Sequence, residues 1–101
     1  LPTFYTMDVS FISQTLLLPA IAAMMPRGAR LVSLIKPQFE AGRAYIGTHG
    51  VVRSEEGRRL ACERVLAAAR GLSLSYGDVI PSPIKGGDGN REYLVCFTKE
   101  Q

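Results

Sequence analysis

The sequence predicts an α/β fold with a mostly parallel sheet and an antiparallel last strand. Apolar and β-favouring runs alternate with helical patterns in the order strand, helix, strand, helix, strand, strand. The run at residues 30–35 is mostly apolar, as in strands of a parallel sheet that are covered on both faces. Crossover helices make successive strands parallel, so the first three strands should be parallel and the last two should form an antiparallel ribbon.

The first two predicted elements are a strand at residues 4–7 and a helix at residues 14–25. Phe-Tyr-Thr-Met favours the strand, and Ser10 and Ser13 are helix-capping residue types. Pro19 cannot donate a hydrogen bond inside a helix. We therefore expect a kink there, or a new helix start with Pro19 in its first turn.

The second strand, at residues 30–35, ends at Lys36-Pro37. Residues 37–53 then show no clean period and are interrupted by glycines, which predicts a loop longer than most connections in compact domains. Loops of that length are usually functional or disordered.

A second helix at residues 55–70 and a two-stranded ribbon complete the domain. Ser54 is a favourable cap, acidic residues follow in the first turn, and a glycine closes the helix. The arginines of this helix fit a solvated face better than an RNA-binding patch. Residues 72–76 and 92–98 have the composition of strands, and the loop at residues 81–90 that joins them is rich in proline and glycine.

Composition indicates a single globular domain. The chain has 101 residues, 47% of them hydrophobic and 21% charged, which is enough for one core. Its net charge of +3 permits an anionic partner without requiring one. The cysteines lack metal-binding spacing, so we expect reduced thiols and no metal site. The longest apolar run is well short of the ~20 residues that span a bilayer, and no signal peptide is visible, which predicts a cytoplasmic protein without a membrane segment.

Three charged residues should meet at one edge of the sheet. Asp8 and Lys36 each follow the carboxyl end of a parallel strand, the edge where open α/β sheets bind their ligands. Glu92 begins the last strand, which runs the opposite way and so starts at the same edge. Burial at a strand end disfavours a charged lysine, whereas a nearby carboxylate favours it and fixes its position. This arrangement predicts a lysine-centred proton-transfer site.

The same spacing also fits a purely structural interpretation. Lys36 could extend to solvent, Asp8 could cap the following helix, and Glu92 could pair with Arg91 or Lys85. Spacing alone leaves both interpretations open.

The long loop contains the candidate RNA contacts. Phe39 and Tyr45 are placed where stacking on a base is possible, and Arg43 and Arg53 could meet the RNA backbone. His49 should be an exposed loop residue, since no partner is spaced for it. The remaining aromatic residues considered are expected in the core: Tyr5, Phe11, Tyr93 and Phe97.

Four motifs follow one another along the chain: Asp8-Val9-Ser10-Phe11-Ile12-Ser13, Lys36-Pro37-Gln38-Phe39-Glu40, Gly50-Val51-Val52-Arg53, and Pro81-Ser82-Pro83-Ile84 followed by Gly89-Asn90-Arg91-Glu92-Tyr93. In this order they closely resemble motifs of the TlyA family. Its members carry the historical label hemolysin A and are FtsJ-like ribosomal RNA 2′-O-methyltransferases. The resemblance extends over essentially the whole chain.

The resemblance implies the carboxyl-terminal half of a Rossmann-like methyltransferase domain, with the antiparallel last strand inserted between two others. FtsJ-like enzymes use a Lys-Asp-Lys-Glu tetrad, and Asp8, Lys36 and Glu92 match its last three members. Lys36 would activate the ribose 2′-hydroxyl, Asp8 would orient Lys36 and border the cofactor, and Glu92 would hold the arrangement. The cofactor would be S-adenosylmethionine, and the partner would be ribosomal RNA.

The rest of the family's machinery is expected upstream of residue 1: the S4 RNA-binding domain, the first tetrad lysine and the glycine-rich cofactor loop. Residues 1–101 would then be a partial catalytic domain, inactive alone, that self-associates through an exposed sheet edge. The loop Gly47-Thr48-His49-Gly50 also departs from the family's usual Gly-Lys-Gly-Gly, which removes a cation that could grip a phosphate backbone.

Two other functions remain open. One is a hemolysin-like, membrane-perturbing protein, although no helical pattern combines a lysine-rich face with a bulky apolar one. The other is an RNA-binding relative without catalytic activity. An intact glycine-rich loop and first tetrad lysine upstream would distinguish an enzyme from that relative.

Overall fold

The structure of the chain, a computed structural model, describes residues 3–83 and 89–101. Within them, one sheet has the strand order β1-β2-β4-β3. The strands are β1 (Phe4–Met7), β2 (Arg30–Ile35), β3 (Leu74–Pro81) and β4 (Tyr93–Lys99). The helices are α1 (Leu18–Met24), α2 (Pro37–Glu40) and α3 (Glu55–Arg70), with the 3-10 turns η1 (Gln14–Leu16), η2 (Arg43–Tyr45) and η3 (Thr48–Gly50).

Strand β4 lies between β2 and β3 and runs antiparallel to both, whereas β1 and β2 are parallel. β3 therefore points the same way as β1 and β2, and the predicted α/β fold with an antiparallel last strand is confirmed. The insertion of β4 between two other strands, which the resemblance implied, is confirmed as well.

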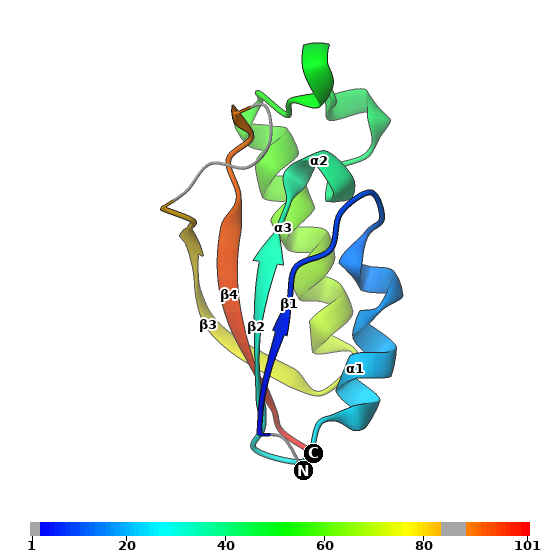
Figure 1. Cartoon of the computed structure of the whole chain (residues 1–101), viewed down its shortest axis with the longest axis vertical. Helices are drawn as coiled ribbons and strands as arrows, with labels where there is room; N and C mark the ends of the chain where they lie inside the picture. Colours follow the sequence, from blue (N-terminus) through cyan, green and yellow to red (C-terminus); the bar gives the residue numbers. More distant parts are fainter. Residues whose placement is uncertain (1–2, 84–88) are drawn as a thin grey trace.

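Coverage of the sheet differs from the prediction. In β2 the side chains of Leu31, Ser33 and Ile35 are buried, but the alternate residues Val32 and Leu34 are only half-buried. The reason is that α1, α2 and α3 all lie on one side of the sheet (Figure 1). Within the described residues, the expectation that this strand is covered on both faces is therefore wrong.

The core lies between α1, α3 and the covered face of the sheet. Phe97 of β4, Val65 of α3 and Leu18 of α1 are fully buried and belong to one apolar cluster. The start of α3 is capped, since the Ser54 hydroxyl accepts a hydrogen bond from the backbone N–H of Gly57 at 3.0 Å. This capping satisfies a donor that the first helical turn would otherwise leave unpaired.

Three predicted segments differ from the elements observed. The predicted helix at 14–25 is split into η1 and α1, and Pro19 lies in the first turn of α1, which is the second of the two expected outcomes. The segment at 37–53 is not a plain loop, because α2 and two 3-10 turns occupy much of it. The strand predicted at 72–76 is β3, which begins only at Leu74, after Ser73 with a positive φ of 60°, and continues to Pro81. In the loop predicted at 81–90, residues 84–88 lie outside the described residues.

Buried polar groups join the segment before α1 to β2 and α2. The Ser33 hydroxyl donates to the side-chain oxygen of Gln14 at 2.5 Å, and the Gln14 amide nitrogen donates to the Leu34 carbonyl at 3.0 Å. The Glu40 carboxylate accepts hydrogen bonds from the Ser13 hydroxyl at 2.5 Å and from the Gln14 backbone N–H at 2.8 Å. Gln14, Ser33 and Glu40 are each at most 5% exposed, so these hydrogen bonds replace water that the groups have lost.

Burial raises the pKa of Glu40 above its ordinary value, while the hydrogen bonds from Ser13 and Gln14 and the charge of Arg64 act in the opposite direction. Arg64 also donates to the Glu40 backbone carbonyl, at 2.9 Å. The folded state therefore binds the Glu40 proton more tightly than the unfolded chain does.

Gly57→Ala is expected to lower the free energy of unfolding by about 1 to 3 kcal/mol, although alanine is normally the better helix former. A Cβ at position 57 would lie 2.9 Å from Val52 Cγ1 and 3.0 Å from Tyr45 Cβ. The matched control is Gly71→Ala at the other end of α3, where φ is −71° and the nearest atom would be 3.6 Å away. Urea unfolding should separate the two variants, and equal stabilities would contradict the contact argument.

Glu40→Gln is expected to become more stable relative to the natural protein as the pH rises. Because the folded pKa of Glu40 is raised, its stabilising contribution is complete below the unfolded pKa and is lost as the pH rises through the folded value. Urea unfolding between about pH 4 and pH 7 measures this as a difference between the two proteins. If the natural protein instead became more stable relative to the variant over this range, the hydrogen bonds to Glu40 would outweigh burial in setting its pKa.

Candidate active site

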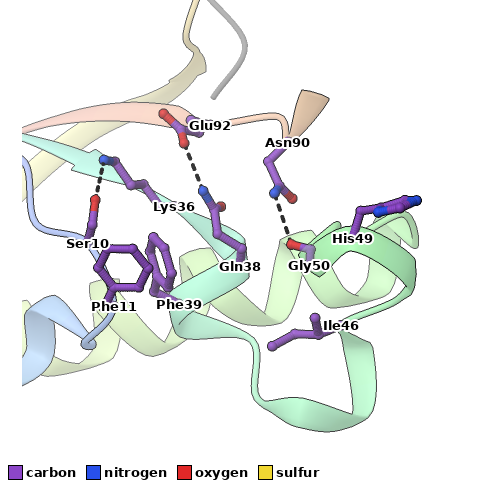
Figure 2. Close-up of a pocket in the computed structure, with 10 residues that line it drawn as sticks. All are labelled: Ser10, Phe11, Lys36, Gln38, Phe39, Ile46, His49, Gly50, Asn90 and Glu92. Atoms are coloured by element: carbon purple, nitrogen blue, oxygen red, sulfur yellow. Dashed lines mark hydrogen bonds between the residues drawn. The ribbon is translucent and has the colours of Figure 1, made fainter. Parts of the chain in front are cut away.

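A hollow of about 540 Å³ opens where β2 ends and β4 begins. Asp8 and Lys36 follow the carboxyl ends of β1 and β2, and Glu92 directly precedes β4. Figure 2 shows Lys36 extending toward Ser10 and Gln38 reaching toward Glu92 in this hollow. Its described lining consists of Ser10, Phe11, Lys36, Gln38, Phe39, Ile46, His49, Gly50, Asn90 and Glu92.

Lys36 is held by two partners on the segment after β1. Its Nζ lies 2.5 Å from Asp8 Oδ1 and donates to the Ser10 hydroxyl oxygen at 3.0 Å. The lysine side chain is 14% exposed, whereas that of Asp8 is 62% exposed. Pro37 begins α2 and turns the chain away immediately after the lysine. The ammonium group is therefore fixed at the strand end, with a carboxylate beside it that remains accessible from solvent.

Glu92 lines the same hollow but has a different partner. The residue is 6% exposed, and its carboxylate accepts a hydrogen bond from Gln38 Nε2 at 3.0 Å. This bond sets the Gln38 amide with its nitrogen toward Glu92. The other end of the amide, Gln38 Oε1, is buried and has no hydrogen-bond partner among the described residues.

The structure thus brings together the three charged residues that the sequence predicted at one edge. Asp8 and Lys36 are in contact, and Glu92 reaches the hollow from β4 and pairs with Gln38 on α2. Of the structural alternatives, capping by Asp8 is not observed, because Ser13 caps η1. Among the described residues Glu92 pairs with Gln38 rather than with Arg91, and Lys85 lies outside the described residues.

Asn90 holds the wall of the hollow in place. Its side-chain oxygen accepts a hydrogen bond from the Val52 backbone N–H at 2.9 Å, and its Nδ2 donates to the Gly50 carbonyl at 3.1 Å (Figure 2). These bonds join the end of the 37–53 segment to the start of β4. The sequence alone did not indicate this role, because Asn90 and its partners lie about forty residues apart along the chain and meet only in the folded structure.

Two aromatic residues form the rim beside Lys36. Phe11 and Phe39 have ring centroids 5.3 Å apart and an interplanar angle of 51°. Phe39, the predicted stacking residue, is half-buried, and Phe11 is 87% exposed. The expectation that Phe11 belongs to the core is therefore wrong. A φ of 71° turns the backbone at Phe11 outward, which a hydrophobicity pattern cannot reveal.

The other predicted loop residues have different environments. Arg43 is exposed on η2, and Arg53 is exposed just before α3. His49 is exposed as expected, has a φ of 62°, and lines the hollow. Tyr45 is half-buried and packs against a small cluster around Val52 instead of facing solvent.

The described part of the chain contains no helix of the length and apolarity needed to cross a bilayer. Among the same residues, no three histidine, cysteine or acidic side chains are grouped as a metal site requires.

The model of one protein family, the FtsJ-like methyltransferases, matches residues 2–99. Among curated proteins, the 16S/23S rRNA (cytidine-2′-O)-methyltransferase TlyA of Mycobacterium tuberculosis is 39% identical over 88 residues, which are 87% of this chain and 33% of TlyA. YqxC of Bacillus subtilis, provisionally named an rRNA methyltransferase, is 39% identical over 94% of this chain and 34% of its own length. Hemolysin A of Brachyspira hyodysenteriae is 35% identical over 96% of this chain and 40% of its own length. The chain thus spans about a third of the length of the curated relatives it matches.

Solved structures agree with these relatives. A Streptococcus thermophilus protein provisionally named a hemolysin has a TM-score of 0.94 and 44% identity, covering 100% of this chain and 36% of its own. The corresponding values for a Lactococcus lactis protein with the same provisional name are 0.93 and 42%, covering 98% and 47%. The resemblance to the TlyA family and the Rossmann-like methyltransferase fold are therefore confirmed. Its family match over nearly every residue shows that this chain belongs to the FtsJ-like methyltransferases.

Proposed function

We propose that this chain is the part of an S-adenosylmethionine-dependent ribosomal RNA 2′-O-methyltransferase that contains the proton-transfer residues. The observation that carries the proposal is the placement of Lys36 between the Asp8 carboxylate and a hollow that Glu92 also lines. The name of TlyA, which specifies rRNA 2′-O-methylation, supports the same reaction. An enzyme acting on ribosomal RNA would work in the cytoplasm.

Lys36 is proposed as the catalytic residue that binds the ribose 2′-hydroxyl. The Lys36 side chain is mostly buried, and two contacts fix the position of Nζ. A hydroxyl group in the hollow would therefore meet a nitrogen atom of defined position. A neutral Nζ would accept the 2′-hydroxyl proton as the oxygen becomes a nucleophile. The fixed geometry would supply much of the rate, since a methyl transfer needs its reacting atoms in line.

Asp8 is proposed to orient Lys36 and to border the cofactor. S-adenosylmethionine, when bound, supplies an electrophilic methyl group on a positively charged sulfonium. The exposed side of the Asp8 carboxylate offers a negative charge at the rim of the hollow, which suits a cation there. Asp8 is the residue of this chain that fits the cofactor, and the remaining contacts are proposed to come from other parts of the full-length protein.

Glu92 is proposed to hold the arrangement through the Gln38 amide and to keep the hollow negatively charged on the side facing β4. For RNA, we propose Phe39 as a stacking surface together with Phe11, and Arg43 and Arg53 as contacts to the backbone. The exposed ring of Phe11 supports stacking at this rim.

Two alternatives can be distinguished from this proposal. A membrane-perturbing protein, as the hemolysin names would have it, should release the contents of liposomes at micromolar concentration. An RNA-binding relative without activity should bind ribosomal subunits but transfer no methyl group. The pairing of Lys36 with Asp8 in a hollow favours the enzyme over both, because neither alternative requires a fixed lysine there.

Lys36→Met in the full-length protein is expected to lower methyl transfer at least about 100-fold, the typical contribution of a positioned acid or base. The assay follows labelled methyl groups from S-adenosylmethionine to ribosomal subunits. Arg27→Met, an exposed cation near the other end of the sheet, is the control and should retain activity. A Lys36 variant that nearly matches the natural protein would reduce Lys36 to a structural ion pair. The isolated 101-residue chain is expected to transfer nothing.

The isolated chain is also expected to self-associate. Among the described strands β1 pairs with β2 alone, and Phe4 and Ile80, 59% and 52% exposed, lie on the uncovered side of the sheet. Sedimentation velocity at rising concentration should show dimers or larger species, and Phe4→Lys should reduce them. Met24→Lys on α1, 62% exposed, is the matched control and should have no effect. A monomer at every concentration would refute association through this edge.

A further inference from the structure

A second hollow, of about 260 Å³, lies beside the candidate active site and is lined by three arginines. Arg53 and Arg91 are exposed, and Arg58, in the first turns of α3, is half-buried. None of the described residues that line it is acidic. Its described lining consists of Val51, Val52, Arg53, Arg58, Gly89 and Arg91.

The guanidinium of Arg58 is held in place by backbone oxygens. Its Nη1 donates to the Arg53 carbonyl at 2.8 Å and to the Val52 carbonyl at 3.5 Å. Both bonds come from one nitrogen, so the donors on the other nitrogens remain for a ligand. Arg58 is therefore oriented without being neutralised.

No ion pair between described residues neutralises the arginines of this hollow. Among the described residues, the ion pairs are Lys36 with Asp8 and Arg70 with Glu63, and neither includes an arginine of this group. Three guanidinium groups around one hollow repel one another, and a bound anion would remove that cost. Phosphate oxygens match the planar, multiple donors of arginine better than other common anions do.

We infer that this arginine hollow binds a phosphate of the RNA backbone and so anchors the substrate next to the active site. The inference rests on the proposed function, because RNA is the proposed substrate. Its position supports it: Gly50 and Asn90 line the active-site hollow, while Val51, Val52, Gly89 and Arg91 line the arginine hollow. The two sites share one wall, which Asn90 holds together. RNA with one ribose at Lys36 can therefore pass its neighbouring backbone over the arginines.

The test uses the full-length protein and a single-stranded RNA oligonucleotide, with binding measured at several salt concentrations. The variant Arg53→Gln/Arg91→Gln removes two charges and leaves Arg58 with its backbone bonds. Arg27→Gln/Arg30→Gln removes the same two charges from exposed positions near the opposite end of β2 and is the matched control. Methyl transfer to ribosomal subunits is measured in parallel, and inorganic phosphate is added as a competitor.

The site variant is expected to bind RNA on the order of tenfold more weakly at low salt, as the loss of two exposed charge contacts would produce. Its slope of log affinity against log salt should fall by about 1.4, that is about 0.7 for each contact with single-stranded RNA. The control should change neither value. In an active enzyme the site variant should raise KM and leave kcat nearly unchanged, because phosphate contacts position the substrate.

Equal weakening in both variants would overturn the site, since only net charge would then matter. An unchanged site variant would also overturn it. If inorganic phosphate bound the natural protein but not the site variant, while both bound RNA equally, the hollow would be a site for free phosphate and not for RNA. The proposed function fails separately, when the natural protein transfers no methyl group, and the difference in RNA binding between the two variants can still be measured in that case.

Discussion

The buried carboxylate of Glu40 is the group on which the geometry of the site depends. It receives hydrogen bonds from Ser13 and from the backbone of Gln14, and Gln14 in turn is bonded to Ser33 inside β2. These contacts fasten the segment after β1 to the strand that ends in Lys36. Asp8 and Ser10 belong to that segment, so their distances to the lysine are set by bonds made several residues away. The hydrogen bonds that offset the burial of Glu40 therefore also set the position of the proposed catalytic residues.

The order and direction of the strands could be predicted because they depend on local pattern and on general rules of chain topology. The mostly apolar run that forms β2 and the capped pattern that forms α3 were both located to within a residue. The sequence did not predict helical turns within residues 37–53, because each turn is short. α2 packs against α3, and the Gly50 carbonyl at the end of η3 accepts a hydrogen bond from Asn90, contacts that the local sequence does not contain. The coverage of the sheet likewise depends on which helices are present on each side, and β2 alone does not contain that information.

The meeting of Asp8, Lys36 and Glu92 at one edge could be derived from strand direction, but their partners could not. Gln38 and Asn90 are ordinary polar residues in sequence. The importance of their side-chain hydrogen bonds appears only once α2 and β4 lie next to each other. Phe11 shows the opposite error, since an apolar residue near a predicted helix is normally assigned to the core. At such a rim an apolar residue is exposed instead of buried, so residue type alone does not predict where the side chain lies.

Asn90, Arg91 and Glu92 are consecutive, and each serves a different part of the surface: Asn90 the loop wall, Arg91 the arginine hollow, and Glu92 the active-site hollow. Because these three residues are adjacent, a shift of this stretch along the chain would move the walls of both hollows together. Deletion of a single residue here would place the Arg91 guanidinium where the Glu92 carboxylate stands. The stretch should therefore be sensitive to its length as well as to substitution, since Asn90 and Glu92 are buried.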